Sequence, residues 1–360
     1  MEDSSLLLDV RNVSVDYGAG GGAVHAVKEV SFRLHRGEIL GLAGESGSGK
    51  STLAYAISRL LQPPAIVTQG EVLYFPRSAL NPRDSVDLIE LSTEELRELR
   101  WNDLALVFQS AMNALNPVMT VGAQVMDVLH THRPQMKRAE QRERAEQLFR
   151  LVGIARDRLG SYPHELSGGM RQRATIAIAL ALSPEIIIMD EPTTALDVVV
   201  QRDILGEIMR LQEHLDFAVI FITHDLSLLL ETADSIGIMY AGRLVEQASS
   251  EDLLQTAAHP YTVGLLHSFP SLRGPRRRGV GIPGTPPDLR AVPPGCAFHP
   301  RCPMAFDRCR DTVPVLQGVT SGSGQLVACH LYRPEYWAHP PTTPEVAAKY
   351  AALAEGSDRQ

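Results

Sequence analysis

The chain has 360 residues, and its 44% hydrophobic and 21% charged residues are ordinary proportions for a globular protein with a sizeable core. A formal net charge of −8 argues against broad nucleic-acid binding, which requires a basic face. The acidic start, MEDSSLLLDV, lacks the basic-then-apolar pattern of a secretory signal, so we expect the chain to stay in the cytoplasm.

The first elements alternate apolar and polar residues over 5–35, which predicts strands of an antiparallel edge sheet. The glycine-rich run at 18–22 between them predicts a flexible loop. From residue 38 onward, short apolar strands alternate with helices, which is the pattern of an α/β core around a mostly parallel sheet.

The middle and end of the chain are more polar. Residues 121–160 favour a solvated helical surface. The apolar stretch 174–189 is interrupted at Ser183 and falls short of the ~20 residues that span a bilayer, so it predicts a helix, a turn and a buried strand. Residues 266–295 are dense in proline, glycine and arginine and predict a linker or wrapping segment, and 336–360 predicts a short helix with a tail.

The segment GESGSGKS fits the G-x-x-x-x-G-K-[ST] phosphate loop and stands between a predicted strand and a predicted helix, as the motif requires. Glycines let backbone N–H groups close around phosphate oxygens, and the helix N-terminus adds partial positive charge. Lys50 can reach the β- and γ-phosphates, and the Ser51 hydroxyl can ligate Mg²⁺. We therefore predict a nucleoside triphosphate site formed by Gly44, Glu45, Ser46, Gly47, Ser48, Gly49, Lys50, Ser51 and Thr52.

A second acidic motif follows the buried strand predicted at EIIIMDE, residues 185–191. The strand would deliver Asp190 to the metal, usually through a water molecule. Glu191, the next residue, is placed to polarise the attacking water.

The sequence LSGGMRQR, residues 166–173, resembles the signature motif of the ATP-binding cassette (ABC) family. Ser167, Gly168 and Gly169 open a predicted helix, where a small hydroxyl and two glycines form an anion site. In that family the motif faces the ATP held by a second cassette. The resemblance therefore implies a dimer with two ATP molecules at its interface.

Other positions match the family in order. The resemblance implies that Tyr17 stacks on adenine, that Asp197 contacts the opposite cassette and that His224 contacts the γ-phosphate. It also implies that Gln109 senses Mg²⁺ and the attacking water, and begins the loop that faces the transmembrane partner. The implied cofactors are ATP and Mg²⁺, with the metal near Ser51, Gln109 and Asp190. The implied catalytic residues are Lys50, Gln109, Glu191 and His224.

The resemblance implies a P-loop ABC nucleotide-binding domain over 1–265, an α/β fold with a mostly parallel core sheet, an antiparallel edge subdomain and a helical subdomain over about 110–182. A linker over 266–295 and a cysteine-rich, metal-binding module over 296–335 follow, and 336–360 forms the short helix and tail.

Further segments, among them EPTTALDVVVQ, HPYTVGLL and GCAFHPRCPMAFDRC, look like those of oligopeptide/dipeptide importer ATPases, and Met170 points to the D-type subunit. The resemblance implies an ATP-hydrolysing subunit, peripheral on the cytoplasmic face of the membrane. Its implied partners are an F-type ATPase, two permeases and an extracytoplasmic substrate-binding protein, with no nucleic acid. The alternatives are import of oligosaccharides or nickel complexes, export, and a non-transport ABC ATPase.

The only cysteines of the chain lie close together, at Cys296, Cys302, Cys309 and Cys329. Their spacing lacks the C-x₂₋₄-C element of most structural zinc sites. Four thiolates from such positions can also enclose a [4Fe–4S] cluster, which some members of the family carry. The cluster, a zinc ion and free thiols stay open as alternatives, and a metal centre would serve as the effective core of this small segment.

Overall fold

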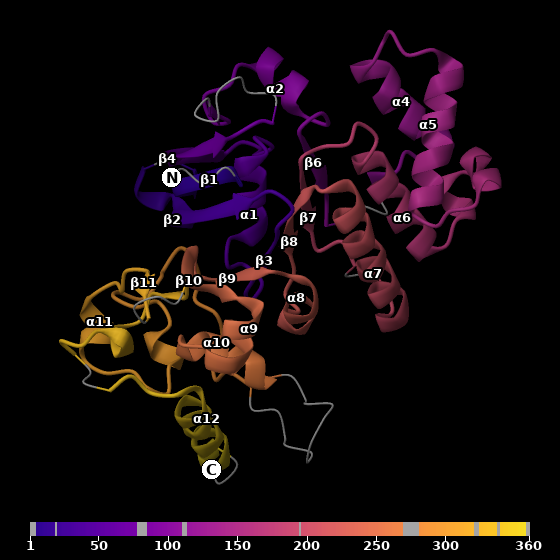
Figure 1. Cartoon of the computed structure of the whole chain (residues 1–360). Helices are drawn as coiled ribbons and strands as arrows, with labels where there is room; N and C mark the ends of the chain where they lie inside the picture. Colours follow the sequence, from indigo (N-terminus) through magenta and orange to yellow (C-terminus); the bar gives the residue numbers. More distant parts are fainter. Residues whose placement is uncertain are drawn as a thin grey trace.

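The computed structural model (Figure 1) describes most of the chain. The described residues are 5–18, 20–77, 85–109, 114–193, 196–268, 281–319, 324–336 and 339–357. The arginine-rich part of the predicted linker, 273–278, lies outside them.

The N-terminal strands form a four-stranded antiparallel sheet in the order β2-β1-β4-β5. The strands are β1 (Leu6–Tyr17), β2 (Val24–His35), β4 (Ala65–Tyr74) and β5 (Val86–Asp87). The alternating pattern buries Val13, Val15 and Val30 in one apolar cluster with Leu53. The predicted antiparallel sheet is thus confirmed. The glycine-rich run differs from the expected loop, because it contains a short 3₁₀ turn, η1 (Gly20–Gly22).

The described residues also form an eight-stranded sheet in the order β11-β12-β10-β9-β3-β8-β7-β6. The strands are β3 (Ile39–Ala43), β6 (Leu104–Val107), β7 (Ile186–Asp190), β8 (Ala218–Ile222), β9 (Ser235–Tyr240), β10 (Arg243–Ser249), β11 (Gln317–Gly318) and β12 (Leu326–Val327). The run from β9 to β6 is parallel, which confirms the predicted parallel core. Every residue of β3, β7 and β8 is buried, as expected for strands covered on both faces.

Helices cover this sheet and extend from it. Their bounds are α1 (Lys50–Ile57), α2 (Thr93–Leu99), α4 (Val121–His132), α5 (Arg138–Leu151), α6 (Gly168–Ala179), α7 (Val198–Leu215), α8 (Leu226–Thr232), α9 (Ser250–Thr256), α10 (Pro260–Ser268), α11 (Arg308–Asp311) and α12 (Thr343–Ser357). Helices α4, α5 and α6 form a group on the right of Figure 1. The prediction of a solvated helical surface holds for their outer faces only, because Val125 and Phe149 are fully buried.

The apolar stretch 174–189 folds as predicted, with α6 ending at Ala179, a turn at Ser183 and the buried strand β7. Within the described residues, no helix is long and apolar enough to cross a membrane.

The C-terminal segment, which the structure describes from residue 281 onward, packs against the rest of the molecule. Strand β12 pairs with β10 and so extends the edge of the main sheet. Phe298 is 1% exposed and belongs to the same apolar cluster as Tyr261 and Tyr350. The structure corrects the expectation that a metal centre is the effective core of this segment, since buried side chains join it to the main core. Helix α12 also packs on α10, where the Tyr350 hydroxyl donates to the Pro260 carbonyl at 3.0 Å.

Candidate active site

The phosphate loop joins the end of β3 to the start of α1, as the motif predicts. Three of its glycines have positive φ angles, 146° at Gly44, 78° at Gly47 and 102° at Gly49. A Cβ atom at Gly44 would lie 2.2 Å from the Met239 carbonyl oxygen, and one at Gly49 would lie 2.4 Å from the Ala26 oxygen. The loop can therefore adopt this path only with glycine at these two positions.

Lys50 lies beneath the loop and is only 5% exposed. Its Nζ atom donates to the carbonyl oxygens of Gly44 at 2.7 Å and Glu45 at 3.0 Å. Burial lowers the pKa of Lys50, while the carboxylates of Glu191, Asp190 and Glu45 act in the opposite direction. The ammonium group thus lies within the predicted phosphate loop, hydrogen-bonded to the backbone of that loop.

Asp190 ends β7 and has no exposed surface. The Ser51 hydroxyl donates to its Oδ1 atom at 3.0 Å, and the Tyr55 hydroxyl lies near this carboxylate, whose charge adds to burial in raising the pKa of Tyr55. Burial raises the pKa of Asp190, and the neighbouring Glu191 charge adds to this effect. Its Oδ2 atom is buried and has no hydrogen-bond partner among the described residues. A buried, unpartnered carboxylate oxygen beside a serine hydroxyl fits a Mg²⁺ site.

Tyr55 is a residue that the sequence analysis missed. It stands four positions after Ser51 on α1, so the two side chains share one face of the helix. That spacing was a usable signal, because it directs a second hydroxyl toward the same carboxylate.

Glu191 is held by two of the other predicted residues. The Gln109 side-chain amide donates to Oε2 of Glu191 at 3.0 Å, and His224 Nδ1 lies 3.3 Å from Oε1. Glu191 also has a φ of +44°, which is unusual for a residue with a side chain and is found at functional sites. The structure therefore brings Gln109, Glu191 and His224 together at the ends of three different strands.

Tyr17 ends β1 and reaches the start of α1. Its hydroxyl shares a hydrogen bond of 3.3 Å with the Thr52 hydroxyl. The predicted adenine-stacking residue therefore lies beside the predicted phosphate-contacting residue.

The signature residues lie with the helical group instead. Ser167 caps α6, where its hydroxyl accepts from the Met170 N–H at 3.3 Å, and Gly168 and Gly169 form the first turn of that helix. Asp197 caps α7 by accepting from the N–H groups of Val199 and Val200. In Figure 1, α6 lies beside α4 and α5, whereas α1 lies on the opposite side of β7. Ser167 and Asp197 are exposed at the starts of α6 and α7, whereas the phosphate loop of the chain opens α1.

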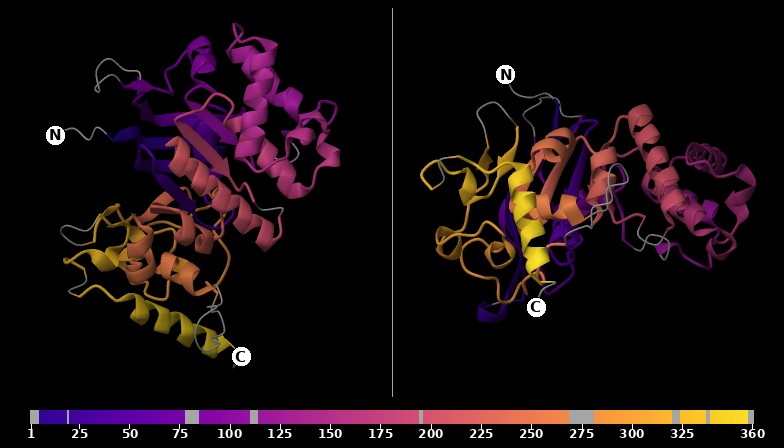
Figure 2. Two further views of the ribbon diagram at one scale, coloured as in Figure 1. Left: turned by 45° about the vertical axis from the view of Figure 1, so that its right-hand side comes forward. Right: turned by 90° about the horizontal axis from the view of Figure 1, so that it is seen from below.

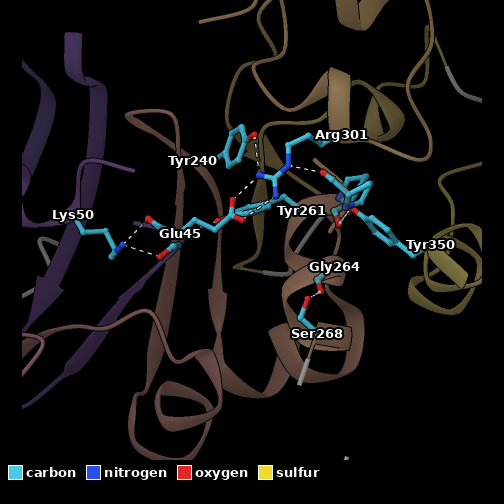
Figure 3. A network of polar contacts seen from close by, with 11 residues as sticks. Glu45, Lys50, Tyr240, Tyr261, Gly264, Ser268, Arg301 and Tyr350 are labelled. Atoms are coloured by element: carbon cyan, nitrogen blue, oxygen red, sulfur yellow. Dashed lines mark hydrogen bonds and ion pairs between the residues drawn. The ribbon is translucent and has the colours of Figure 1, made fainter. Parts of the chain in front are cut away.

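A further network reaches the phosphate loop from the C-terminal segment (Figure 3). The Arg301 guanidinium donates to both oxygens of the Glu45 carboxylate, at 2.6 and 2.9 Å. The Glu45 backbone N–H donates to the Tyr261 hydroxyl at 2.8 Å. Burial alone would lower the pKa of Arg301, but hydrogen bonds to Glu45 and Tyr240 raise it above its usual value. The sequence analysis missed Arg301 and Tyr261, since no local pattern links them to a loop more than 200 residues away.

The four cysteines gather in the C-terminal segment, and all four thiols are free. The Cys296 N–H donates to the Cys309 carbonyl at 2.8 Å. Burial raises the pKa of Cys296 to about 11 and that of Cys302 to about 12, and the neighbouring thiols add to both shifts. Burial likewise raises the pKa of Cys309 and Cys329.

The described residues show no metal-binding group: no three of their His, Cys, Asp or Glu side chains lie where they could hold a metal ion together. The predicted cluster or zinc site is therefore not borne out by the geometry of these side chains.

Comparison with known proteins covers most of the chain. Residues 27–194 match the family described as ABC transporter, and residues 245–309 match the oligopeptide/dipeptide transporter C-terminal region. A probable peptide ABC transporter ATP-binding protein of Sinorhizobium fredii is 46% identical over 323 residues, 89% of this chain and 93% of that protein. The oligopeptide transport ATP-binding protein OppD of Bacillus subtilis is 43% identical over 304 residues, covering 83% of this chain and 82% of that protein.

Among solved structures, the dimeric post-hydrolysis state of the ATP-binding cassette MJ0796, bound to ADP and Pi, aligns with a TM-score of 0.58 and 29% identity. The match covers 68% of this chain and 99% of that one. The structural match and the sequence matches thus both agree with the ATP-binding motifs of the chain. The chain is an ATPase that belongs to the ABC transporter family, in the group that carries the oligopeptide/dipeptide transporter C-terminal region.

Proposed function

We propose that this chain is the D-type ATPase subunit of an importer for di- and oligopeptides. The observation that carries the proposal is the combination, in one chain, of a complete set of ATP-site motifs with the oligopeptide/dipeptide transporter C-terminal region. The names of the relatives, which are peptide, oligopeptide and dipeptide transport ATP-binding proteins, support the same substrate class.

The proposed chemistry assigns a task to each residue. The loop N–H groups and Lys50 bind the phosphates, and Ser51, Asp190 and Gln109 would hold Mg²⁺. The metal, when bound, supplies positive charge that offsets the charge of the phosphate oxygens. Glu191 accepts a proton from the attacking water, while Gln109 and His224 keep its two carboxylate oxygens in place.

The proposed partner across the ATP is a second, F-type cassette. Ser167, Gly168 and Gly169 would face the ATP of that partner, and Asp197 would contact it. Val198 and Val199, which follow Asp197, are each 70% exposed, and two adjacent exposed valines favour a protein interface at this place.

The proposed permease contact lies in the segment after Gln109, of which residues 110–113 are outside the described residues. A cavity of about 330 Å³ opens there between Phe108, Met119 and Val128. Val118 is 79% exposed beside it, and Phe108 is 41% exposed. A cavity with apolar and polar lining residues and with exposed apolar neighbours suits a short permease helix. Two permeases and an extracytoplasmic binding protein would complete the importer, with this chain at the cytoplasmic face of the membrane.

The decisive test of the ATPase mechanism is Glu191→Gln in the assembled transporter. The variant should bind ATP like the wild type but hydrolyse it at least about 100-fold more slowly, because an amide cannot accept the proton of water. ATP binding is measured with a fluorescent nucleotide and turnover by phosphate release. Glu71→Gln, which changes a carboxylate that is 56% exposed, is the matched control and should retain full turnover. Full ATPase activity in Glu191→Gln would overturn the assignment.

The substrate class is tested on the extracytoplasmic binding protein proposed as a partner of this chain. Mass spectrometry of the ligand retained by that protein should identify peptides. A sugar or a nickel complex would redirect the assignment to one of the alternative cargoes, and the absence of permease genes would favour a non-transport ABC ATPase.

We also propose that Cys296, Cys302, Cys309 and Cys329 hold a [4Fe–4S] cluster. The proposal is supported by the sequence, in which all four cysteines lie between residues 296 and 329, and by the backbone hydrogen bond that joins Cys296 to Cys309. The four thiols would have to come closer together than they lie in this structure. The cluster would need the thiolate form of each ligand, so its assembly would release protons from these buried groups.

The cluster is tested by anaerobic purification. The expected result is a brown protein with broad visible absorption and with iron and acid-labile sulfide in equal amounts, both lost in Cys309→Ser. A colourless protein with one zinc ion per chain, or with four free thiols and no metal, would exclude the cluster.

A further inference from the structure

The C-terminal segment meets the phosphate loop at one ion pair (Figure 3). Arg301 is 6% exposed at its side chain, and its two terminal nitrogens bind the two oxygens of Glu45. A bidentate contact of this kind fixes both the position and the orientation of the carboxylate. Glu45 is the second residue of the loop, directly after Gly44.

Arg301 is itself held in place by its surroundings. Its Nε atom donates to the Pro283 carbonyl at 2.9 Å, and its Nη1 atom donates to the Tyr240 hydroxyl at 3.3 Å. The guanidinium also lies 5.9 Å from the ring centres of Tyr240 and Phe298. Because the Tyr240 and Phe298 rings beside the guanidinium are buried, they restrict its movement and so help Arg301 to hold Glu45 in place.

The backbone of Glu45 is held from the same side. Its N–H donates to the hydroxyl of Tyr261, which has no exposed surface. A cavity of about 430 Å³ separates the loop residues Ser46–Ser48 from the C-terminal residues Pro286–Arg290. The C-terminal segment therefore borders the loop as well as pairing with one of its side chains.

The charge of Glu45 gives this contact a consequence for ATP. A carboxylate in the phosphate loop repels a nearby triphosphate, and water only partly screens the repulsion because the Glu45 side chain is 26% exposed. The Arg301 guanidinium compensates that charge. Glu45 is also coupled to Lys50, since the Glu45 carbonyl accepts from Nζ at 3.0 Å. A shift of Glu45 would therefore move both the loop backbone and the lysine that faces the phosphates.

We propose that Arg301 is a positioning residue of the ATP site, through which the C-terminal segment sets the affinity of the phosphate loop for ATP. It acts by compensating and orienting the Glu45 carboxylate. The inference rests on the proposed function of the phosphate loop and goes beyond it, because it makes nucleotide affinity depend on a residue outside the ABC-transporter match at 27–194.

The test compares Arg301→Met, Glu45→Gln and the double variant in the assembled transporter, with Mg-ATP as the probe. Arg301→Met should raise the KM for ATP roughly tenfold with a smaller change in kcat, because the carboxylate at the second position of the phosphate loop then loses its partner and its compensating charge. The double variant should recover at least about threefold of that loss, because the repelling charge is gone. Arg301→Lys, which keeps the charge but not the bidentate contact, should lie between the wild type and Arg301→Met.

A matched control separates this effect from general damage to the segment. Arg308→Met removes an arginine of the same segment, which lies over the Tyr336 ring at 5.3 Å, and should leave the KM unchanged. A KM within twofold of wild type in Arg301→Met, or a double variant as impaired as Arg301→Met, would overturn the inference. If Arg301→Met does not fold, an unchanged KM in Arg301→Lys overturns it instead. A wild-type chain that fails to bind ATP would contradict the proposed function itself, so the two failures are distinguishable.

Discussion

Gly44 has the closest backbone surroundings of the glycines in the phosphate loop. Its φ of +146° is rarely adopted by residues with a side chain. A Cβ atom added at Gly44 would lie 2.2 Å from the carbonyl oxygen of Met239. The obstacle is backbone of the adjacent strand β9, which cannot move aside like a flexible side chain. The conformation of the loop therefore depends on the absence of one methyl group.

Replacing Gly44 with alanine should remove ATP binding and lower the free energy of unfolding by about 2 kcal/mol or more, because the residue is strained and the loop must shift. Nucleotide titration and chemical denaturation measure the two effects. Gly206→Ala is the control, since a Cβ at Gly206 in α7 meets nothing within 4 Å. That variant should be about 0.5–1 kcal/mol more stable, because alanine favours a helix interior. Wild-type ATP affinity in Gly44→Ala would contradict the argument.

At this scale the sequence was sufficient wherever residues act through a local motif. Lys50 and Ser51 are identified by the spacing of the loop, and Asp190 by the apolar strand that precedes it. Arg301 was not predictable, because its role comes from a contact that the fold alone creates across 256 positions of sequence.

The connection between β10 and α10 links the C-terminal segment to the main sheet through hydrogen bonds. Glu246 of β10 has no exposed surface, and it accepts from the N–H groups of Ala258 and His259 at 2.7 and 2.9 Å. Gln325, next to β12, donates to the same carboxylate at 2.9 Å. One buried side chain thus holds together a strand, a helix start and the added edge strand.

His259, in the connection between β10 and α10, makes the stability of the folded chain depend on pH. Burial lowers the pKa of His259 from 6.5 to about 3, so below pH 6.5 the unfolded chain takes up a proton that the folded chain does not. The free energy of unfolding should therefore fall by about 1.4 kcal/mol per pH unit below pH 6.5, and be unaffected by this group above it. Denaturation at pH 7.5, 6 and 5 measures the slope.

His259→Asn is the comparison for that slope. Asparagine can still accept the hydrogen bond that His259 Nδ1 accepts from the Tyr261 N–H at 3.0 Å, but it does not titrate. The variant should lose the extra acid sensitivity, while Glu246, whose pKa burial raises, contributes equally to both proteins. Parallel stability curves for the two proteins would show that His259 is not the cause.

The longer elements were predictable because periodicity specifies them. The strands of the parallel core and the antiparallel edge sheet follow from apolar runs and alternation. Strands β11 and β12 were not predictable, because each has two residues and exists only through pairing with β10 or with the other. The domain limits proposed from the sequence therefore stay predictions.

The whole molecule has two regions that flank the ATP site. Figure 2 shows the helical group α4–α6 and the C-terminal segment at opposite ends of the molecule in its right-hand view. The proposed permease surface near Phe108 belongs to the first region, and Arg301 belongs to the second. Two separate surfaces therefore reach the same site, one through Gln109 and the other through Glu45.

The separation of Glu45 and Arg301 by 256 residues also bears on how the chain is made. At roughly 5–20 residues per second, a ribosome needs between about 13 and 50 s to pass from one to the other. During that time the nascent chain carries a phosphate loop without its arginine. If Arg301 sets the affinity of the loop as proposed, full affinity for nucleotide is acquired only after residue 301 has been synthesised and folded.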